Sequence, residues 1–138
     1  MRPDTAEWIK KAEADFLSMT REMNAATDLN YDLVCFVAQQ SVEKYLKALL
    51  CETSVPFPKI HDLNKLAALL PEHFGYPENF SEPISRLDRY AIEFRYPGAS
   101  TAVGSGGCRK RSDASGLVRK NVKTMTQCGA FQSALSGG

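Results

Sequence analysis

Residues able to bind phosphate or move a proton are few in this sequence. Arg95 and Tyr96 precede a Pro-Gly pair at the predicted end of a helix, where a guanidinium could hold a phosphate and a phenol ring could stack on a base. His61 lies beside Asp62 at the predicted start of another helix, and histidine suits acid–base work because its pKa lies near neutrality. Structural roles compete with each: a cation favours a helix C-terminus, turn tyrosines are commonly buried, and a His-Asp pair can cap a helix.

A further polar group lies inside the most apolar stretch of the chain. Glu43 and Lys47 are four residues apart on one side of a predicted helix, with Lys44 beside them. Such a pair on an exposed helix stabilises it by only about 0.3 kcal/mol; the alternative is a polar patch that lines a nucleotide or partner surface. Gln39 and Gln40 precede this group. Buried amides need hydrogen-bond partners, so we expect both to bond across the bundle or across a dimer seam.

The elements that must position these residues are helices. Apolar residues recur at spacings of three and four, and no alternating strand pattern is found. Helix caps are predicted at Asp4, with Glu7 completing a capping box, within the segment Asp28-Leu29-Asn30, at His61-Asp62 and at Ser81. The predicted helices cover about residues 4–23, 32–52, 61–70 and 81–96. We expect an all-α fold, an antiparallel up-and-down bundle of four main helices.

The composition changes at about residue 104. Residues 1–103 hold 11 Lys/Arg and 15 Asp/Glu, whereas residues 104–138 hold 6 Lys/Arg and only one acidic residue. Seven of the nine glycines also lie after residue 103, and each costs a helix interior roughly 1 kcal/mol relative to alanine. We therefore expect a helical domain over 1–103 and a flexible Gly/Ser/basic tail over 104–138, irregular or with a short fifth helix near 116–127.

Two explanations of this tail stay open. Its basic residues could contact RNA phosphates without reading sequence. Alternatively, a shift of reading frame near residue 104 has left a truncated copy without activity. The basic residues concerned are Arg109, Lys110, Arg111, Arg119, Lys120 and Lys123.

Several classes of protein are excluded by what the sequence lacks. No apolar run approaches the roughly 18 residues that a membrane span needs, and the first ten residues are too polar for a signal peptide. We expect a cytoplasmic protein. The four cysteines include no close pair, so they are expected to be reduced and to bind no metal. Glycine-rich motifs that bind nucleotide phosphates, such as the P-loop, are missing as well. No cofactor is therefore expected.

Two stretches resemble the HEPN family, in its minimal free-standing prokaryotic form. Residues 35–50 (CFVAQQSVEKYLKALL) are similar to the second helix of that family, and residues 87–97 resemble its penultimate helix and the Arg-Tyr-Pro turn that closes it. The resemblance implies a dimeric bundle of four to five helices that is often paired with a minimal nucleotidyltransferase, as in toxin–antitoxin systems. Many members are metal-independent ribonucleases with an R-x(4–6)-H motif.

The sequence departs from the family at that motif. Arg95 matches its arginine, but no histidine follows it, so the usual proton carrier is missing. We therefore predict a non-catalytic HEPN-type module that binds nucleotide, RNA or a partner protein, as a homodimer and with a nucleotidyltransferase. The alternative is an endoribonuclease toxin in which Arg95 acts with Tyr96 or His61. The ligand-binding candidates are Arg95, Tyr96, Lys44, Lys47 and His61, and the partner-surface candidates are Gln39, Gln40 and Glu43.

Overall fold

The computed structural model describes residues 1–74, 80–87 and 105–127, and all regular secondary structure in these ranges is helical. The prediction of an all-α bundle is therefore confirmed. Nowhere in these ranges is a helix both long and apolar enough to span a membrane. The elements are α1 (Pro3–Met23), α2 (Tyr31–Glu52), α3 (Leu63–Ala68), the 3-10 helix η1 (Glu72–Phe74), a helix at 80–87, and α5 (Ser105–Gln127).

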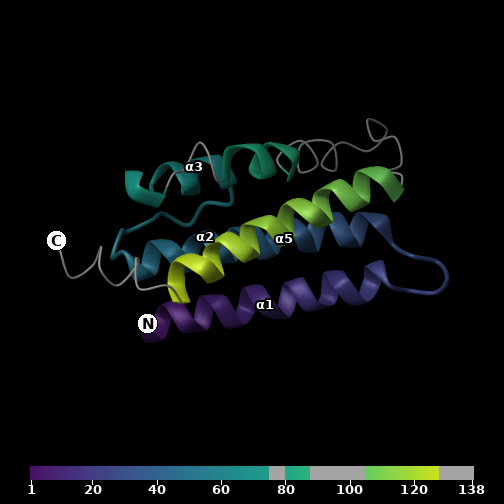
Figure 1. The fold of residues 1–138 in the computed structure, drawn as a ribbon, viewed down its shortest axis with the longest axis horizontal. Coiled ribbons are helices and arrows are strands. Elements are labelled where there is room, and N and C mark those ends of the chain that lie inside the picture. The colour runs from purple at the N-terminus through teal and green to yellow at the C-terminus, as the bar shows by residue number, and fades with distance from the viewer. Residues whose placement is uncertain (75–79, 88–104, 128–138) are drawn as a thin grey trace.

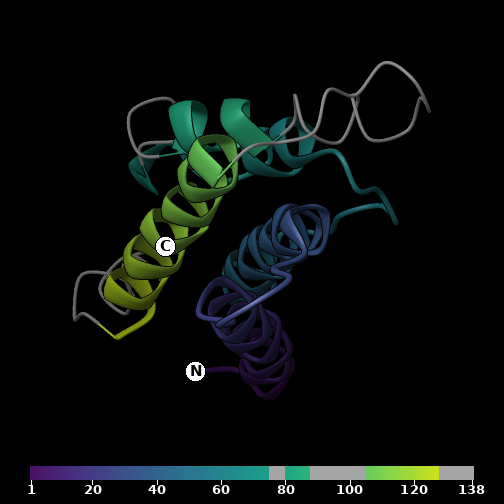
Figure 2. The same cartoon turned by 90° about the vertical axis from the view of Figure 1, so that its right-hand side faces the viewer.

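The three long helices lie along the length of the molecule (Figure 1). Helix α1 runs antiparallel to α2, and α5 runs in the same direction as α2. Figures 1 and 2 both show α3 and the helix at 80–87 on one side, with α1 at the opposite edge. Helix α2 packs against α1, α5 and α3, so it is the central helix that its broad apolar surface predicts.

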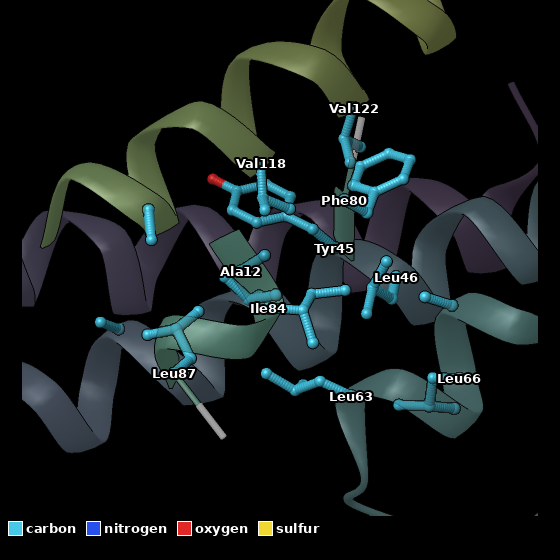
Figure 3. Packing of buried hydrophobic residues seen from close by; sticks show 14 of the residues in the cluster. Ala12, Tyr45, Leu46, Leu63, Leu66, Phe80, Ile84, Leu87, Val118 and Val122 are labelled. Atoms are coloured by element: carbon cyan, nitrogen blue, oxygen red, sulfur yellow. The ribbon is translucent and has the colours of Figure 1, made fainter. Parts of the chain in front are cut away.

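The core is formed by every helix of the bundle. Figure 3 shows Ala12, Tyr45, Leu63, Ile84 and Val118 converging from α1, α2, α3, the helix at 80–87 and α5. Removing a Leu, Ile or Val side chain from water stabilises the fold by about 1.5–3 kcal/mol. The apolar face of α2 is fully buried: Val34, Ala38, Val42, Tyr45, Leu46 and Leu49.

Two of the four predicted helix caps are confirmed. The side chains of Asn30 and Asp62 accept hydrogen bonds from the backbone N–H of Leu33 (3.0 Å) and Lys65 (3.1 Å). The cap at Asp4 is wrong, because the helix already begins at Pro3, whose missing N–H suits a first helical position. Ser81 is not a cap either, because Phe80 is already helical.

Helix α5 differs from the sequence-based expectation. It is a continuous helix from Ser105, whereas only a short helix near residues 116–127 was expected. Packing explains the difference: Val118 and Val122 are fully buried against the core, and the hydroxyl groups of Ser41 and Ser115 lie 2.7 Å apart between α2 and α5. Helical stability in proteins comes mainly from such tertiary contacts, which here outweigh the low propensity of three glycines.

Candidate functional site

A buried carboxylate organises the polar residues that the sequence singles out on α2. Glu43 Oε1 lies 2.5 Å from His61 Nδ1 and 3.7 Å from Lys47 Nζ. The Glu43 and Lys47 side chains are only 5% and 10% exposed, whereas the His61 side chain is 74% exposed. The spacing of Glu43 and Lys47 is also that of an exposed i,i+4 ion pair. Their burial shows that this interpretation is wrong. Their burial gives the interaction more electrostatic weight than a surface pair has.

An aromatic side chain adjoins Lys47. The Nζ atoms of Lys47 and Lys11 lie 5.3 and 5.5 Å from the centre of the Trp8 ring, within the range of a cation–π interaction. The ring of Phe57 meets Trp8 edge-on, with 6.5 Å between ring centres. We name these residues the Trp8 surface: Trp8, Lys11, Lys47, Phe57 and His61.

Contacts between the start of α1 and the end of α2 fix the position of Trp8. Glu52 Oε1 accepts hydrogen bonds from the backbone N–H of Arg2 (2.9 Å) and from the hydroxyl of Thr5 (3.3 Å). This carboxylate thus joins the N-terminus of α1 to the last turn of α2, about one turn of helix from Trp8 and from Lys47. The loop after α2 then returns along the bundle and supplies both Phe57 and His61.

A second charge cluster lies where α1, α2 and α5 meet. Glu13 of α1 accepts hydrogen bonds from the Tyr45 hydroxyl (2.9 Å) and from Arg119 Nη2 (3.1 Å), and Lys123 Nζ lies 3.0 Å away. Burial raises the pKa of Glu13, but the hydrogen bonds from Lys123, Arg119 and Tyr45 lower it further, to below its ordinary value. Burial and the bond to Glu13 raise the pKa of Tyr45, so its hydroxyl remains a donor.

An open groove borders the Glu13 cluster. It has a volume of about 480 Å³ and is lined by α1 and by Arg119, whose guanidinium lies 4.7 Å above the centre of the Phe16 ring. Because the charges of Arg119 and Lys123 are paired with Glu13, this side of the bundle offers less free positive charge than the tail sequence predicts.

The remaining predicted site residues are placed differently. Lys44 forms an ion pair with Asp15 of α1 rather than with the Glu43 group. Gln39 and Gln40 are half-buried on α2. Arg95 and Tyr96 lie outside the described residues.

Sequence reasoning missed three contributors to these clusters. These are Glu13, Lys11 and Trp8, none of which was singled out from the sequence. The signal that was available is that Trp8 is the only tryptophan of the chain. Its neighbour Lys47 could not be found from the sequence, because this lysine comes from another helix.

The Trp8 surface can do two kinds of chemistry. An aromatic ring with ammonium groups close by can stack on a base while the cations hold phosphates. A histidine ring held through Nδ1 by a carboxylate has Nε2 for proton transfer or hydrogen bonding.

No group of three His, Cys, Asp or Glu side chains that could hold a metal is found among the described residues.

Comparisons with known proteins agree with this architecture. The family model for the HEPN domain matches residues 5–125. The crystal structure of an archaeal HEPN homologue superposes with a TM-score of 0.66 and 23% sequence identity, over 91% of this chain and 98% of that chain. At that identity the likeness shows the fold alone. A search of curated proteins gave no match. Because the family model covers most of the sequence, up to and including nearly all of α5, this chain belongs to the HEPN domain family.

Proposed function

We propose that this chain is a non-catalytic HEPN module that binds single-stranded RNA or nucleotide at the Trp8 surface. One observation carries the proposal: the Lys11 and Lys47 ammonium groups both lie over the Trp8 ring, and Lys47 shares the Glu43 carboxylate with the exposed His61. Stacking of a base on an aromatic ring contributes about 1–3 kcal/mol. The lysines then add attraction to the phosphates that does not depend on sequence.

Glu43 supports this role by holding the cations in place. Its carboxylate is buried and bonded to the exposed His61, so an approaching phosphate meets this ring and the exposed Lys11 before the negative charge. An ammonium group that is already oriented also loses less conformational entropy on binding. Glu43 is therefore a positioning residue in this proposal.

The test uses the fluorescence of Trp8. Because this is the only tryptophan, titration with a short single-stranded RNA should quench its emission if a base stacks on the ring. Lys11→Gln should weaken binding about threefold to tenfold and reduce the salt dependence by about one phosphate contact. Lys110→Gln removes the same charge from the far end of α5 and serves as the matched control.

The two lysine variants distinguish the binding faces. Weaker binding in Lys11→Gln together with wild-type binding in Lys110→Gln supports the Trp8 surface. The reverse result moves the RNA to α5 and contradicts the proposal, as does the absence of both quenching and binding.

An endoribonuclease is the second candidate, and the His61–Glu43 pair favours it. A carboxylate that holds Nδ1 orients the ring, as general acid–base catalysis requires. In this alternative Arg95 holds the phosphate and His61 carries the proton. Incubation with cellular RNA separates the two candidates: cleavage that is abolished by both Arg95→Ala and His61→Ala supports the enzyme.

We further propose that the module is a homodimer and works with a nucleotidyltransferase. Exposed apolar side chains on α2 support an interface there: Leu33 and Phe36 are 44% and 47% exposed, next to the half-buried Gln40. Light scattering should give a dimer mass that Leu33→Glu lowers to that of a monomer. A nucleotidyltransferase gene beside this one would support the proposal that the module works with that enzyme. An unrelated neighbouring gene would weaken the proposal.

A broken copy without activity is the least supported alternative. The packing of α5 on α2 and its ion pairs with Glu13 favour a last helix that belongs to the bundle. The family model also extends over this helix, to residue 125.

A further inference from the structure

Three sulfur atoms from three helices meet at one end of the bundle. Cys108 of α5 donates a hydrogen bond to the Met23 thioether at the end of α1, with 3.2 Å between the sulfurs. The thiol groups of Cys35, on α2, and Cys108 each shift the pKa of the other, so the two lie close together. Both cysteines are fully buried, and Met23 packs against the same core cluster.

We propose that Cys35, Cys108 and Met23 form a binding site for Cu(I). Thiolate and thioether ligands favour soft metal ions, and Cu(I) is the first-row ion that this donor set selects. A dry, sulfur-lined site also disfavours hard cations such as Mg²⁺, which keep their water and prefer oxygen ligands. A site of this kind is hidden in the sequence, since its two cysteines are far apart along the chain and its third donor is a methionine.

Charge and proton balance are consistent with this ion. Binding of one Cu(I) forms three Cu–S bonds and releases the two thiol protons, which leaves a group of net charge −1. The Arg111 guanidinium lies near enough to both thiols to offset that charge. Burial raises the pKa of both thiols, that of Cys35 to about 12, while Arg111 acts on each in the opposite direction.

The geometry of the Cys108–Met23 pair needs only a small adjustment. Three sulfurs around a metal at about 2.3 Å lie almost 4 Å apart, so the separation of 3.2 Å between Cys108 and Met23 must widen by less than about 1 Å. Met23 is unbranched and is the last residue of α1, so rotation of its side chain can supply this change. The bound ion would then join α1, α2 and α5 at one point.

Two matched variants test the site by anaerobic titration with Cu(I) against a chromophoric chelator. The variant Cys51→Ser/Cys128→Ser keeps the sulfur group, and Cys35→Ser/Cys108→Ser keeps the other two cysteines, so each has two thiols. Cys51→Ser/Cys128→Ser should bind one equivalent of Cu(I) about 100-fold more tightly than Cys35→Ser/Cys108→Ser, because linked donors act together. Met23→Leu should weaken binding about tenfold, as one of three linked donors is lost.

Two further measurements guard against a misfolded variant. X-ray absorption on the full wild-type chain should give sulfur-only coordination of the copper, and Cu(I) should raise the unfolding temperature of Cys51→Ser/Cys128→Ser. Equal affinities in the two double variants would show adventitious thiol binding and overturn the site. Oxygen or nitrogen ligands in the absorption spectrum, or no effect on unfolding, would overturn it as well.

Discussion

Two glutamates, Glu13 and Glu43, gather cations in this bundle, and their surroundings differ. Glu13 lies between α1, α2 and α5 and accepts from Tyr45, Arg119 and Lys123, which come from helices distant in sequence. Glu43 is more deeply buried, but its partners are Lys47 of its own helix and the exposed His61 of a loop. The first cluster joins helices, and the second presents a histidine and a cation–aromatic group to solvent.

The comparison separates a structural role from a functional one. All three donors at Glu13 are engaged in positioning α5, so a ligand would have to compete with the fold for them. At Glu43 the buried carboxylate holds His61, whose largely exposed ring still has Nε2 to offer. The accessibility of this histidine, rather than the burial of the carboxylate, therefore marks the candidate site.

Loss of the Glu43 carboxylate should have the largest effect. Glu43→Ala leaves the buried Lys47 ammonium without its anion and should lower the free energy of unfolding by about 2–3 kcal/mol, measured in urea. The exposed pair Glu82–Arg86 has the same i,i+4 spacing, and Glu82→Ala should cost no more than about 0.5 kcal/mol. Similar costs for both variants would mean that burial does not distinguish the pairs.

Loss of the Glu13 carboxylate should rank next. Glu13→Ala leaves the Tyr45 hydroxyl and two cations unpaired and should cost about 2 kcal/mol. Hydrogen exchange should show that α5 loses more protection than α3. Glu7→Ala, on the exposed side of α1, is the control, with a change within about 0.5 kcal/mol. Uniform loss of protection would contradict the assignment of Glu13 to α5.

Acid should remove the contribution of Glu13. Its pKa is lower in the folded than in the unfolded chain, where it is near 4.5, so the carboxylate stabilises the fold fully above that value. The stability is lost as the pH falls through the folded pKa. The difference between wild type and Glu13→Gln should therefore be constant near neutrality and shrink below about pH 4.5. A difference that persists at lower pH would point to packing rather than charge.

Gly116→Ala should stabilise the protein modestly. An added Cβ would lie 3.9 Å from the Phe16 ring, an ordinary contact, and alanine favours a helix interior by about 1 kcal/mol over glycine. Thermal unfolding measures the gain. A lower unfolding temperature would indicate that α5 packs more tightly on Phe16 than the structure has it.

The smallest effect on stability should come from His61. Because its side chain is largely exposed, His61→Gln should change the free energy of unfolding by no more than about 0.5 kcal/mol. RNA affinity should still fall a few-fold, since the ring belongs to the Trp8 surface. Loss of stability without loss of affinity would reverse the roles assigned to the two clusters.

Much of the fold could be predicted from local pattern. The spacing of apolar residues gave α1 and α2 nearly to the residue. Helix starts were recognised at residues 28–30 and 61–62, because capping side chains such as those of Asn30 and Asp62 bond within three residues. The site was predicted only in part. Glu43, Lys47 and His61 were named and do lie together, whereas Trp8 and Lys11 were not connected with them.

The sequence by itself determined the helical class and the family, because both depend on periodicity and on short motifs of adjacent residues. Only the tertiary structure decided that α5 is a full helix, since its low intrinsic propensity is outweighed by burial of Val118 and Val122 and by ion pairs with Glu13. It also decided which carboxylate joins helices and which holds exposed groups. Those roles depend on contacts between residues up to 110 positions apart, as for Glu13 and Lys123, and no local pattern encodes them.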